Sequence, residues 1–561
     1  MYRFRQDPPP AVAPTRNCSA QPRAWDELLS QLERDVLTPT SRLAHPGYFA
    51  FIPASSTFAG ALGDLIAAAL DIDVGSWMSA AGPSQLELTV LEWFKEWIGY
   101  PAGAAGILVS GGSAANITAL ACARESLVGA GSDLAVAYVA DQTHSSVARA
   151  ARLIGFRPDQ LRVLPTDDAH RIRLDALAGA IEADAQAGRH PLIVAANAGA
   201  TNTGAVNPLD ALADFCRDHR LWLHVDAAYG GFAALTQRGR EALAGIERAD
   251  SVTLDPHKWL YQPIECGSVL VRDGHRLQEA FTINPDYLAD YKSEEVNFAD
   301  RGVQLTRSAR ALKIWLSISY FGLDAFRQAI DRAIDLAHRA EDYIRASPTL
   351  ELLSPASLGI VCFRRRFDAI TGEDELGQLN AQLVSGFEAT GSGLLSSTKL
   401  RGRYAIRLCV MNHTTGPVDV DAVRATALGV PRLAHAASPG YPGRSADRRG
   451  DRPSGSRSLA SPPAISRAGP VQESRETPAA PELFIHGGDP CGTRSTAAAS
   501  YTCGHRRSKL RGGSATDCFM PHEAMRLLLL GIAGIERSVS WRAGGSTILI
   551  AEPPGSRCSS T

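Results

Sequence analysis

The chain has 561 residues, a formal net charge of −2 at pH 7 and 45% hydrophobic residues, so it is long enough to bury at least one large core. A charge near zero gives no electrostatic reason to expect nucleic acid as the main partner, and the apolar runs are shorter than the roughly 20 residues that cross a bilayer. The ten cysteines are scattered singly without metal-type spacing, which favours reduced thiols. Because the first residues contain no apolar signal-peptide core, we expect a cytoplasmic protein without a membrane or nucleic-acid partner.

The first predicted element is an amphipathic helix that follows an N-terminal arm, because Trp25, Leu32 and Val36 have helical spacing. A second helix is predicted over residues 85–99. Beyond it, short apolar runs alternate with helical patterns, and this alternation predicts an α/β domain with a largely parallel sheet. The predicted strands are 107–109, 134–139, 192–196, 221–225, 252–254 and 269–271.

The C-terminal part has a different pattern. A long helical pattern over 309–344, followed by alternating segments at 359–363 and 404–410, predicts a smaller α+β domain. Beyond it, Gly, Pro, Ser and Arg dominate, which favours disorder. The predicted division is 1–57 for the arm and helix, 58–318 for the large domain, 319–430 for the small domain and 431–561 for a low-complexity tail.

Lys258 and Asp226 are the strongest candidate site residues. Lys258 closes the run 251–258, about thirty residues after Asp226, and both follow predicted strands. This pair suits pyridoxal phosphate, whose aldehyde forms a Schiff base with an amine and whose pyridine nitrogen needs a carboxylate to stay protonated. Burying a carboxylate at a strand end is costly without such a partner. The alternative for Asp226 is a cap of the next helix.

Further candidates follow other predicted strands. The segment 106–120 indicates a strand, a glycine turn and a helix start, where backbone N–H groups and Ser113 could hold a phosphate. His144 could lie flat on the pyridine ring, or could be a helix cap or a core residue. Thr201, in a small-residue loop, could hydrogen-bond the cofactor or the substrate carboxylate. Open α/β sheets bind ligands at the carboxyl ends of their strands, so these residues are expected to meet.

These motifs resemble the group II pyridoxal-phosphate-dependent amino-acid decarboxylases. The resemblance spans about residues 25 to 430 and excludes the tail. Its most specific part is the Pro-His-Lys run with the upstream Asp-Ala-Ala. The matching stretches are 45–49, 110–113, 144–147, 224–229, 255–258, 303–307, 311–315 and 407–413.

The resemblance implies a fold-type I architecture, with a mostly parallel seven-stranded sheet and a smaller α+β domain, in a homodimer with active sites at the subunit interface. It implies decarboxylation of an L-amino acid to the amine and CO2. The family's cofactor lysine falls on Lys258, its pyridinium acid on Asp226 and its ring-stacking histidine on His144. The other implied cofactor contacts are Gly112, Ser113, Ala114, Thr201, Ala228, Asp255 and His257.

One departure concerns the family's mobile loop, whose tyrosine protonates the substrate carbon. Depending on the gap, Phe298 or Arg301 occupies that place, and Tyr287 and Tyr291 do not match it by position. In plant relatives a phenylalanine there accompanies an oxygen-dependent reaction that forms an aldehyde. An aldehyde product is therefore the alternative to simple decarboxylation.

The segments that resemble the family's substrate pocket are rich in aromatic residues. A ring-lined slot favours an aromatic substrate, although such residues can also be simple core. The candidate substrate contacts are Phe49, Phe51, Trp77 and Phe298. An acidic substrate such as glutamate stays open through Arg272 or Arg307, and a diamino acid substrate is a further alternative. An aminotransferase could use Arg407 for the substrate carboxylate. A catalytically impaired paralogue is the remaining alternative.

Overall fold

The computed structural model describes residues 21–128, 133–283, 295–368, 370–429, 541–543 and 546–548. All of these belong to one unit of the chain, and the second unit, residues 433–515, lies outside the described residues, as does the predicted arm before residue 21. In the predicted tail only β13 (Trp541–Ala543) and β14 (Ser546–Ile548), which pair antiparallel, are described. The expected disorder of the tail and the predicted domain limits therefore stay predictions.

The large sheet has seven strands in the order β2-β8-β7-β6-β5-β3-β4. β8 runs antiparallel to both neighbours, whereas the other pairs are parallel, which confirms the predicted α/β class and mostly parallel sheet. The strands are β2 (Ala105–Val109), β3 (Ala135–Ala140), β4 (Leu161–Leu164), β5 (His190–Asn197), β6 (Trp222–Asp226), β7 (Ser251–Leu254) and β8 (Gly267–Val271).

The burial of a strand explains whether it could be predicted from the sequence. Every residue of β3, β6, β7 and β8 is buried, as expected for inner strands of a sheet covered on both faces. β4 was not predicted, because it is an edge strand whose Val163 is 63% exposed. Helix α4 contacts β2, β5, β6, β7 and β8 and so crosses one face of the sheet.

The helices associated with the large sheet include the predicted segment 85–99, which starts earlier than expected, at Ala81. They are α2 (Phe58–Ala69), α3 (Ala81–Ile98), α4 (Gly112–Val128), α5 (Ser145–Leu153), α6 (Leu174–Gln186), α7 (Leu209–His219), α8 (Gln237–Ala242) and α9 (Gly274–Phe281). Short 3-10 turns lie at η2 (Pro158–Gln160), η3 (Gly231–Leu235), η4 (Ile246–Arg248) and η6 (Phe298–Arg301).

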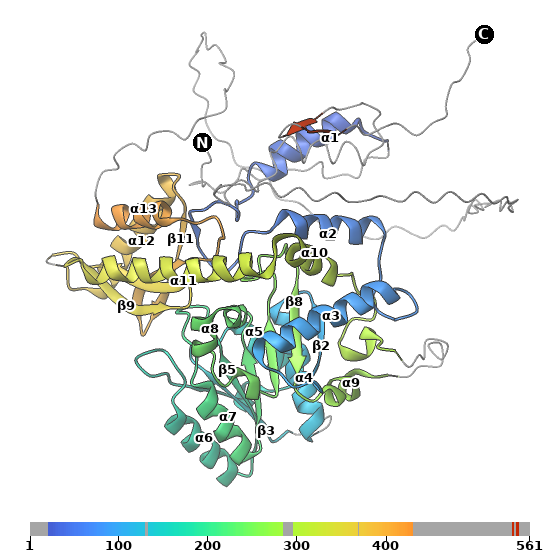
Figure 1. The fold of residues 1–561 in the computed structure, drawn as a ribbon. Coiled ribbons are helices and arrows are strands. Elements are labelled where there is room, and N and C mark those ends of the chain that lie inside the picture. Colours follow the sequence, from blue (N-terminus) through green and yellow to red (C-terminus); the bar gives the residue numbers. More distant parts are fainter. Residues whose placement is uncertain are drawn as a thin grey trace, which may run out of the picture. The chain divides into compact units, whose positions relative to one another are not determined.

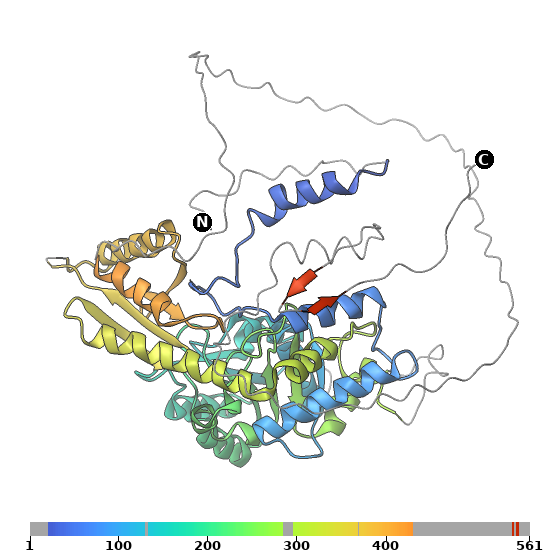
Figure 2. The ribbon, with the colours of Figure 1, turned by 45° about the horizontal axis from the view of Figure 1, so that its top comes forward.

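The second sheet has the order β1-β11-β12-β10-β9 and includes a strand from the N-terminal region. Its strands are β1 (Tyr48–Phe49), β9 (Leu350–Ser357), β10 (Ile360–Arg365), β11 (Leu394–Leu400) and β12 (Arg403–Cys409). Its helices are α11 (Leu323–Arg345), α12 (Glu373–Ala389) and α13 (Pro417–Leu428). Helix α11 runs alongside β9 (Figures 1 and 2), and the arrangement confirms a smaller α+β region.

The pattern over 309–344 predicted one long helix, but the structure has two helices there. They are α10 (Ala311–Phe321) and α11, which are separated by Gly322. Gly322 has a φ of 78° and a ψ of 148°, a conformation that only glycine adopts at low cost. The break lets the chain leave the large sheet and continue along the small one.

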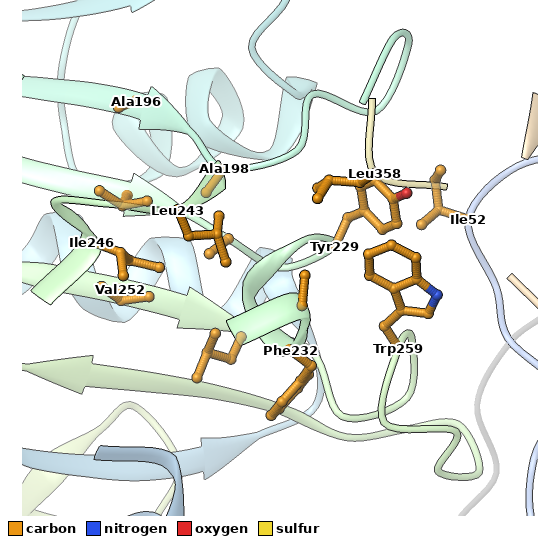
Figure 3. Packing of buried hydrophobic residues seen from close by; sticks show 14 of the residues in the cluster. Ile52, Ala196, Ala198, Tyr229, Phe232, Leu243, Ile246, Val252, Trp259 and Leu358 are labelled. Carbon is orange, nitrogen blue, oxygen red and sulfur yellow. The ribbon is translucent and has the colours of Figure 1, made fainter. Parts of the chain in front are cut away.

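A shared core joins the two sheets next to the strand ends. The rings of Tyr229 and Trp259 lie 4.9 Å apart, with Leu358 and Ile52 in the same cluster (Figure 3). The Tyr229 hydroxyl accepts a hydrogen bond from the Gly359 N–H at 2.8 Å. Because Leu358 and Gly359 lie between β9 and β10, this contact fixes the small sheet against the loop that follows β6.

The N-terminal helical segment has no buried residue. It consists of α1 (Trp25–Gln31) and a π-helical turn, η1 (Leu32–Leu37), as the sequence predicted for this region. Four of its apolar side chains, Trp25, Leu32, Val36 and Leu37, are exposed, and Leu28 and Leu29 are half-buried. Within the described ranges no helix combines the length and the hydropathy that a bilayer crossing requires.

Candidate active site

A cavity of about 450 Å³ lies at the carboxyl ends of β2, β3, β5, β6 and β7. This is the edge at which parallel α/β sheets bind ligands. Segments far apart in the chain therefore meet there, as the sequence predicted. Every predicted cofactor residue lines the cavity: Gly112, Ser113, Ala114, His144, Thr201, Asp226, Ala228, Asp255, His257 and Lys258.

Lys258 lies in the turn after β7, with its amine against a buried acid. Its Nζ is 2.9 Å from Oδ2 of Asp255, whose side chain is 1% exposed, whereas that of Lys258 is 22% exposed. The other oxygen of Asp255 has no hydrogen-bond partner within the described part of the chain. The ion pair holds the lysine amine at the cavity wall, where it can reach a bound aldehyde.

Asp226 ends β6 and is 8% exposed. Its Oδ2 accepts a hydrogen bond from Nδ2 of Asn116 at 3.0 Å, and its Oδ1 accepts one from the Ala228 N–H at 3.2 Å. Both donors are neutral, and among the described residues no Lys, Arg or His pairs with this carboxylate within 4.0 Å. A buried acid in this state can accept a cationic partner from the cavity.

His144 is both a helix cap and a cavity residue. It is the N-cap of α5, and its Nδ1 accepts the Ser146 N–H at 3.2 Å and lies 2.8 Å from the Ser146 hydroxyl. Burial lowers the pKa of His144 below its usual 6.5, and nearby Lys258 adds to this, although Asp226 opposes it. The imidazole is therefore neutral near pH 7. The two interpretations of His144 left open by the sequence are compatible.

The glycine turn before α4 is closely packed. A Cβ on Gly112 would lie 2.8 Å from Oδ2 of Asp255, and one on Gly111 would lie 3.0 Å from the ring of His257. Without these side chains, the first N–H groups of α4 stay open to the cavity. A helix N-terminus with free N–H groups is a suitable site for a phosphate.

Arg407 supports the loop that carries Thr201. Its guanidinium donates to the backbone carbonyls of Thr201 and Asn202 and, at 2.9 Å, to Oγ of Ser396. Arg407 is 4% exposed and does not line the cavity. Its donors are thus used within the protein, and the arginine does not act as the substrate clamp of an aminotransferase.

The predicted substrate contacts do not line the cavity of this chain. Phe49 and Phe298 are fully buried, Phe49 next to Phe387 and Phe298 beneath the guanidinium of Arg307 at 4.9 Å. Their hydrophobic burial explains these positions. Phe51 is 60% exposed and Trp77 is partly buried, so neither is explained by core packing and both stay candidates.

The arginines considered for substrate recognition have other contacts or lie away from the cavity. Arg307 forms a fully buried ion pair with Glu87 at 2.6 Å, and Arg272 donates to the backbone carbonyl of Glu247. Arg301 follows Phe298 in η6 and is outside the cavity lining. Tyr287 and Tyr291 lie outside the described residues.

The residues behind Asp226 were not predicted from the sequence. Asn116 and His224 are fully buried polar residues that contact each other and the acid or its neighbours. A signal was present: β6 and β7 carry polar residues at every second position although both strands are buried. These positions are Trp222, His224 and Asp226 on β6, and Ser251 and Thr253 on β7.

These features fit pyridoxal phosphate. The site has a lysine amine, a buried acid free of a cationic partner, a neutral imidazole and an open helix N-terminus, which match the aldehyde, the ring nitrogen, the ring face and the phosphate. Nδ2 of Asn197, a residue of the cavity lining, is also buried without a partner in the described structure. An unsatisfied buried amide of this kind favours a polar ligand.

Comparisons with known proteins agree. Residues 12–366 match the pyridoxal-dependent decarboxylase conserved domain. The chain is 42% identical to the aromatic-L-amino-acid decarboxylase of Bacillus atrophaeus over 69% of its own length and 82% of the relative. It is 29% identical to the phenylacetaldehyde synthase of Petunia hybrida, over 72% and 83% of the two chains. The crystal structure of Oryza sativa TDC with PLP and tryptamine superimposes with a TM-score of 0.70 at 29% identity, covering 74% of this chain and 90% of that one.

The predicted resemblance is thereby confirmed, together with the fold-type I architecture and the cofactor. The family model covers the described chain from its N-terminal helix to β10 of the second sheet. The chain belongs to the pyridoxal-dependent decarboxylase family, and it is a pyridoxal-phosphate-dependent amino-acid decarboxylase.

Proposed function

We propose that this decarboxylase acts on an aromatic L-amino acid and releases the amine and CO2, with Lys258, Asp226 and His144 as its catalytic residues. The observation that carries the proposal is that these three side chains line one cavity. The names of relatives support the substrate class, since they include an aromatic-L-amino-acid decarboxylase and a TDC that holds tryptamine.

Each residue has a role that follows from its position. Bound pyridoxal phosphate supplies an electron-withdrawing ring that accepts the electrons left by departing CO2. Lys258 provides the amine that holds the cofactor, Asp226 keeps a proton on the ring nitrogen, and neutral His144 covers the ring face. The proposed phosphate and ring contacts are Gly112, Ser113, Ala114, Thr201, Ala228, Asp255 and His257.

The test is to incubate the purified protein and cofactor with a panel of amino acids and to identify products by mass. We expect CO2 and the amines of tryptophan, tyrosine or phenylalanine, and no product from Lys258→Ala. Borohydride reduction and peptide mapping should place the cofactor label on Lys258. Preference for glutamate or a diamino acid would contradict the substrate class, and release of ammonia and peroxide in air would identify the aldehyde-forming reaction.

Phe51 is the best supported of the predicted substrate contacts. Its ring is 60% exposed, and its backbone N–H donates to Oγ of Ser396 at 3.3 Å. Ser396 also binds Arg407, which holds the backbone of Thr201 in the cavity lining. A ring held next to this loop could contact an aromatic substrate at the cavity mouth.

The chain is proposed to form a homodimer. Trp25, Leu32 and Val36 are each at least 40% exposed and follow one another by seven and four residues, so they form one apolar stripe. Burial against a second copy would remove this stripe from water. Sedimentation should show a dimer that a triple serine variant of these residues weakens; a variant that stays dimeric would contradict this interface.

A cytoplasmic location is also proposed. The five cysteines within the described residues are all buried and free, as is usual for proteins of a reducing compartment. Fractionation of cells that produce the tagged protein tests this location.

A further inference from the structure

A buried polar cluster lies between α4 and the large sheet, behind the cavity. It contains side chains from one face of β6 and β7, and three of them, His224, Asp226 and Thr253, contact Asn116 of α4. His224 Nε2 lies 3.1 Å from Oδ1 of Asn116, and the Thr253 hydroxyl donates to the same oxygen at 2.7 Å. The amide group of Asn116 donates to Asp226 at 3.0 Å and to Oγ of Ser146 at 2.9 Å.

The cluster continues away from the cavity to a residue that can only donate. Nε1 of Trp222 donates to Oγ of Ser251 at 2.8 Å, and this oxygen lies 2.9 Å from Nδ1 of His224. Toward the cavity, Ser146 connects Asn116 to Nδ1 of His144. A single chain of hydrogen bonds thus runs from Trp222 to both the acid and the imidazole of the site.

One assignment of protons satisfies every member of this chain. Ser251 accepts from Trp222 and donates to Nδ1 of His224, so the proton of His224 is on Nε2. That N–H then donates to Oδ1 of Asn116. The amide NH2 therefore faces Asp226, and the ionised carboxylate of Asp226 accepts its hydrogen bond. Ser146 accepts from the same amide, and its hydroxyl lies 2.8 Å from Nδ1 of His144. Because this Nδ1 also accepts the backbone N–H of Ser146, the proton of His144 is on Nε2.

The other tautomer of His224 reverses the central amide. With its proton on Nδ1, His224 would accept at Nε2, and Asn116 would have to turn its NH2 toward it. Oδ1 of Asn116 would then face Oδ2 of Asp226 at about the present 3.0 Å, so that only a protonated Asp226 could make a hydrogen bond there. The tautomer of His224 and the charge of Asp226 are therefore coupled through Asn116.

We propose that Asn116 and His224 are positioning residues, which act through Asp226: the Nε2–H of His224 orients the Asn116 amide, and the amide keeps Asp226 an ionised acceptor for the ring nitrogen. The inference rests on the proposed role of Asp226. Burial lowers the pKa of His224 to about 4, so the imidazole stays neutral and carries a single proton, on either Nδ1 or Nε2. Asn116 and His224 are each 0% exposed, so water does not compete for these contacts.

The test compares two ligands on the apo protein. One is pyridoxal phosphate; the other is its deaza analogue, in which a carbon replaces the ring nitrogen while the aldehyde and phosphate are unchanged. Wild-type protein should bind pyridoxal phosphate more tightly. Asn116→Leu should reduce this preference on the order of 10- to 100-fold, as expected for lost hydrogen bonds to a charged group. His224→Leu should reduce it in the same direction.

Rescue and control variants separate positioning from loosening of the fold. His224→Gln retains a donor near Nε2 and should retain most of the preference. Val252→Ala, on the opposite face of β7, should change both affinities equally. If Asn116→Leu and His224→Leu also change both affinities equally, the inference is overturned. If neither wild type nor Asp226→Ala distinguishes the ligands, the proposed role of Asp226 itself fails.

Discussion

The two faces of strands β6 and β7 are equally buried but differ in chemistry. The face toward Asn116 carries His224, Asp226 and Thr253 in a hydrogen-bonded cluster, whereas the intervening residues, such as Val225 and Val252, are apolar and fully buried. Polar burial of this kind gains little stability over an apolar core. One face therefore maintains the sheet, while the other prepares a site.

The strongest test of this difference is Asp226→Asn. The change removes the carboxylate that we propose to pair with the ring nitrogen, so decarboxylation should fall on the order of 10²- to 10³-fold. The free energy of unfolding of the apo protein should stay the same or rise, because an amide costs less to bury than a carboxylate. Steady-state kinetics and urea unfolding measure the two effects, and a large loss of stability would contradict the comparison.

Val225→Ala should show the opposite behaviour. Val225 lies next to Asp226 and is 0% exposed. Loss of its methyl groups should lower the free energy of unfolding by about 2 kcal/mol, from lost burial and the cavity left behind. The value of kcat for protein that remains folded should change less than about twofold. A loss of kcat as large as that of Asp226→Asn would show that the two faces are not separable.

The polar face should also make stability depend on pH. The pKa of His224 is lowered to about 4 from its ordinary 6.5, so between these values the unfolded chain binds a proton that the folded chain does not. Unfolding free energy therefore falls as the pH drops, and His224 should contribute a loss of about 2 kcal/mol between pH 7 and 5. His224→Gln, which cannot titrate, should lose less stability over this range in urea unfolding. Equal losses in the two proteins would argue against the lowered pKa.

The smallest effect is expected for Phe51, which lies on neither face. Phe51→Ala should lower kcat/KM for an aromatic substrate about 3- to 10-fold, roughly 1 kcal/mol of ring contact, with little change in stability. Val163→Ala, an equally exposed apolar residue on the edge strand β4, is the matched control and should have no effect. Equal behaviour of the two variants would remove Phe51 from the substrate site.

Much of the fold and the lining of the candidate site could be predicted from the sequence, because both depend on local patterns. Buried strands are apolar runs, and residues that follow them meet at one sheet edge, as Lys258 and Asp226 do. β4 was not predicted, because half-exposed edge strands lack a continuous apolar run. The contact between Asn116 and Asp226 joins residues 110 positions apart, and only the packing of α4 on the sheet brings them together.

The substrate wall was harder to predict for another reason. An aromatic side chain can fill a core or line a pocket, and the sequence does not distinguish the two for Phe49 or Phe298. The structure buries both. Likewise, Arg407 has the residue type of a carboxylate clamp, but its donors are used by backbone carbonyls.

The contacts of Arg407 have a mechanical consequence. The residue belongs to β12 of the small sheet, yet it binds two carbonyls of the loop that follows β5 of the large sheet. A rotation of the small sheet must therefore either pull this loop along or break both hydrogen bonds at once. The position of Thr201 thus depends on how the two sheets are docked, and a disturbance as remote as the far end of β12 can alter the cavity wall that Thr201 forms.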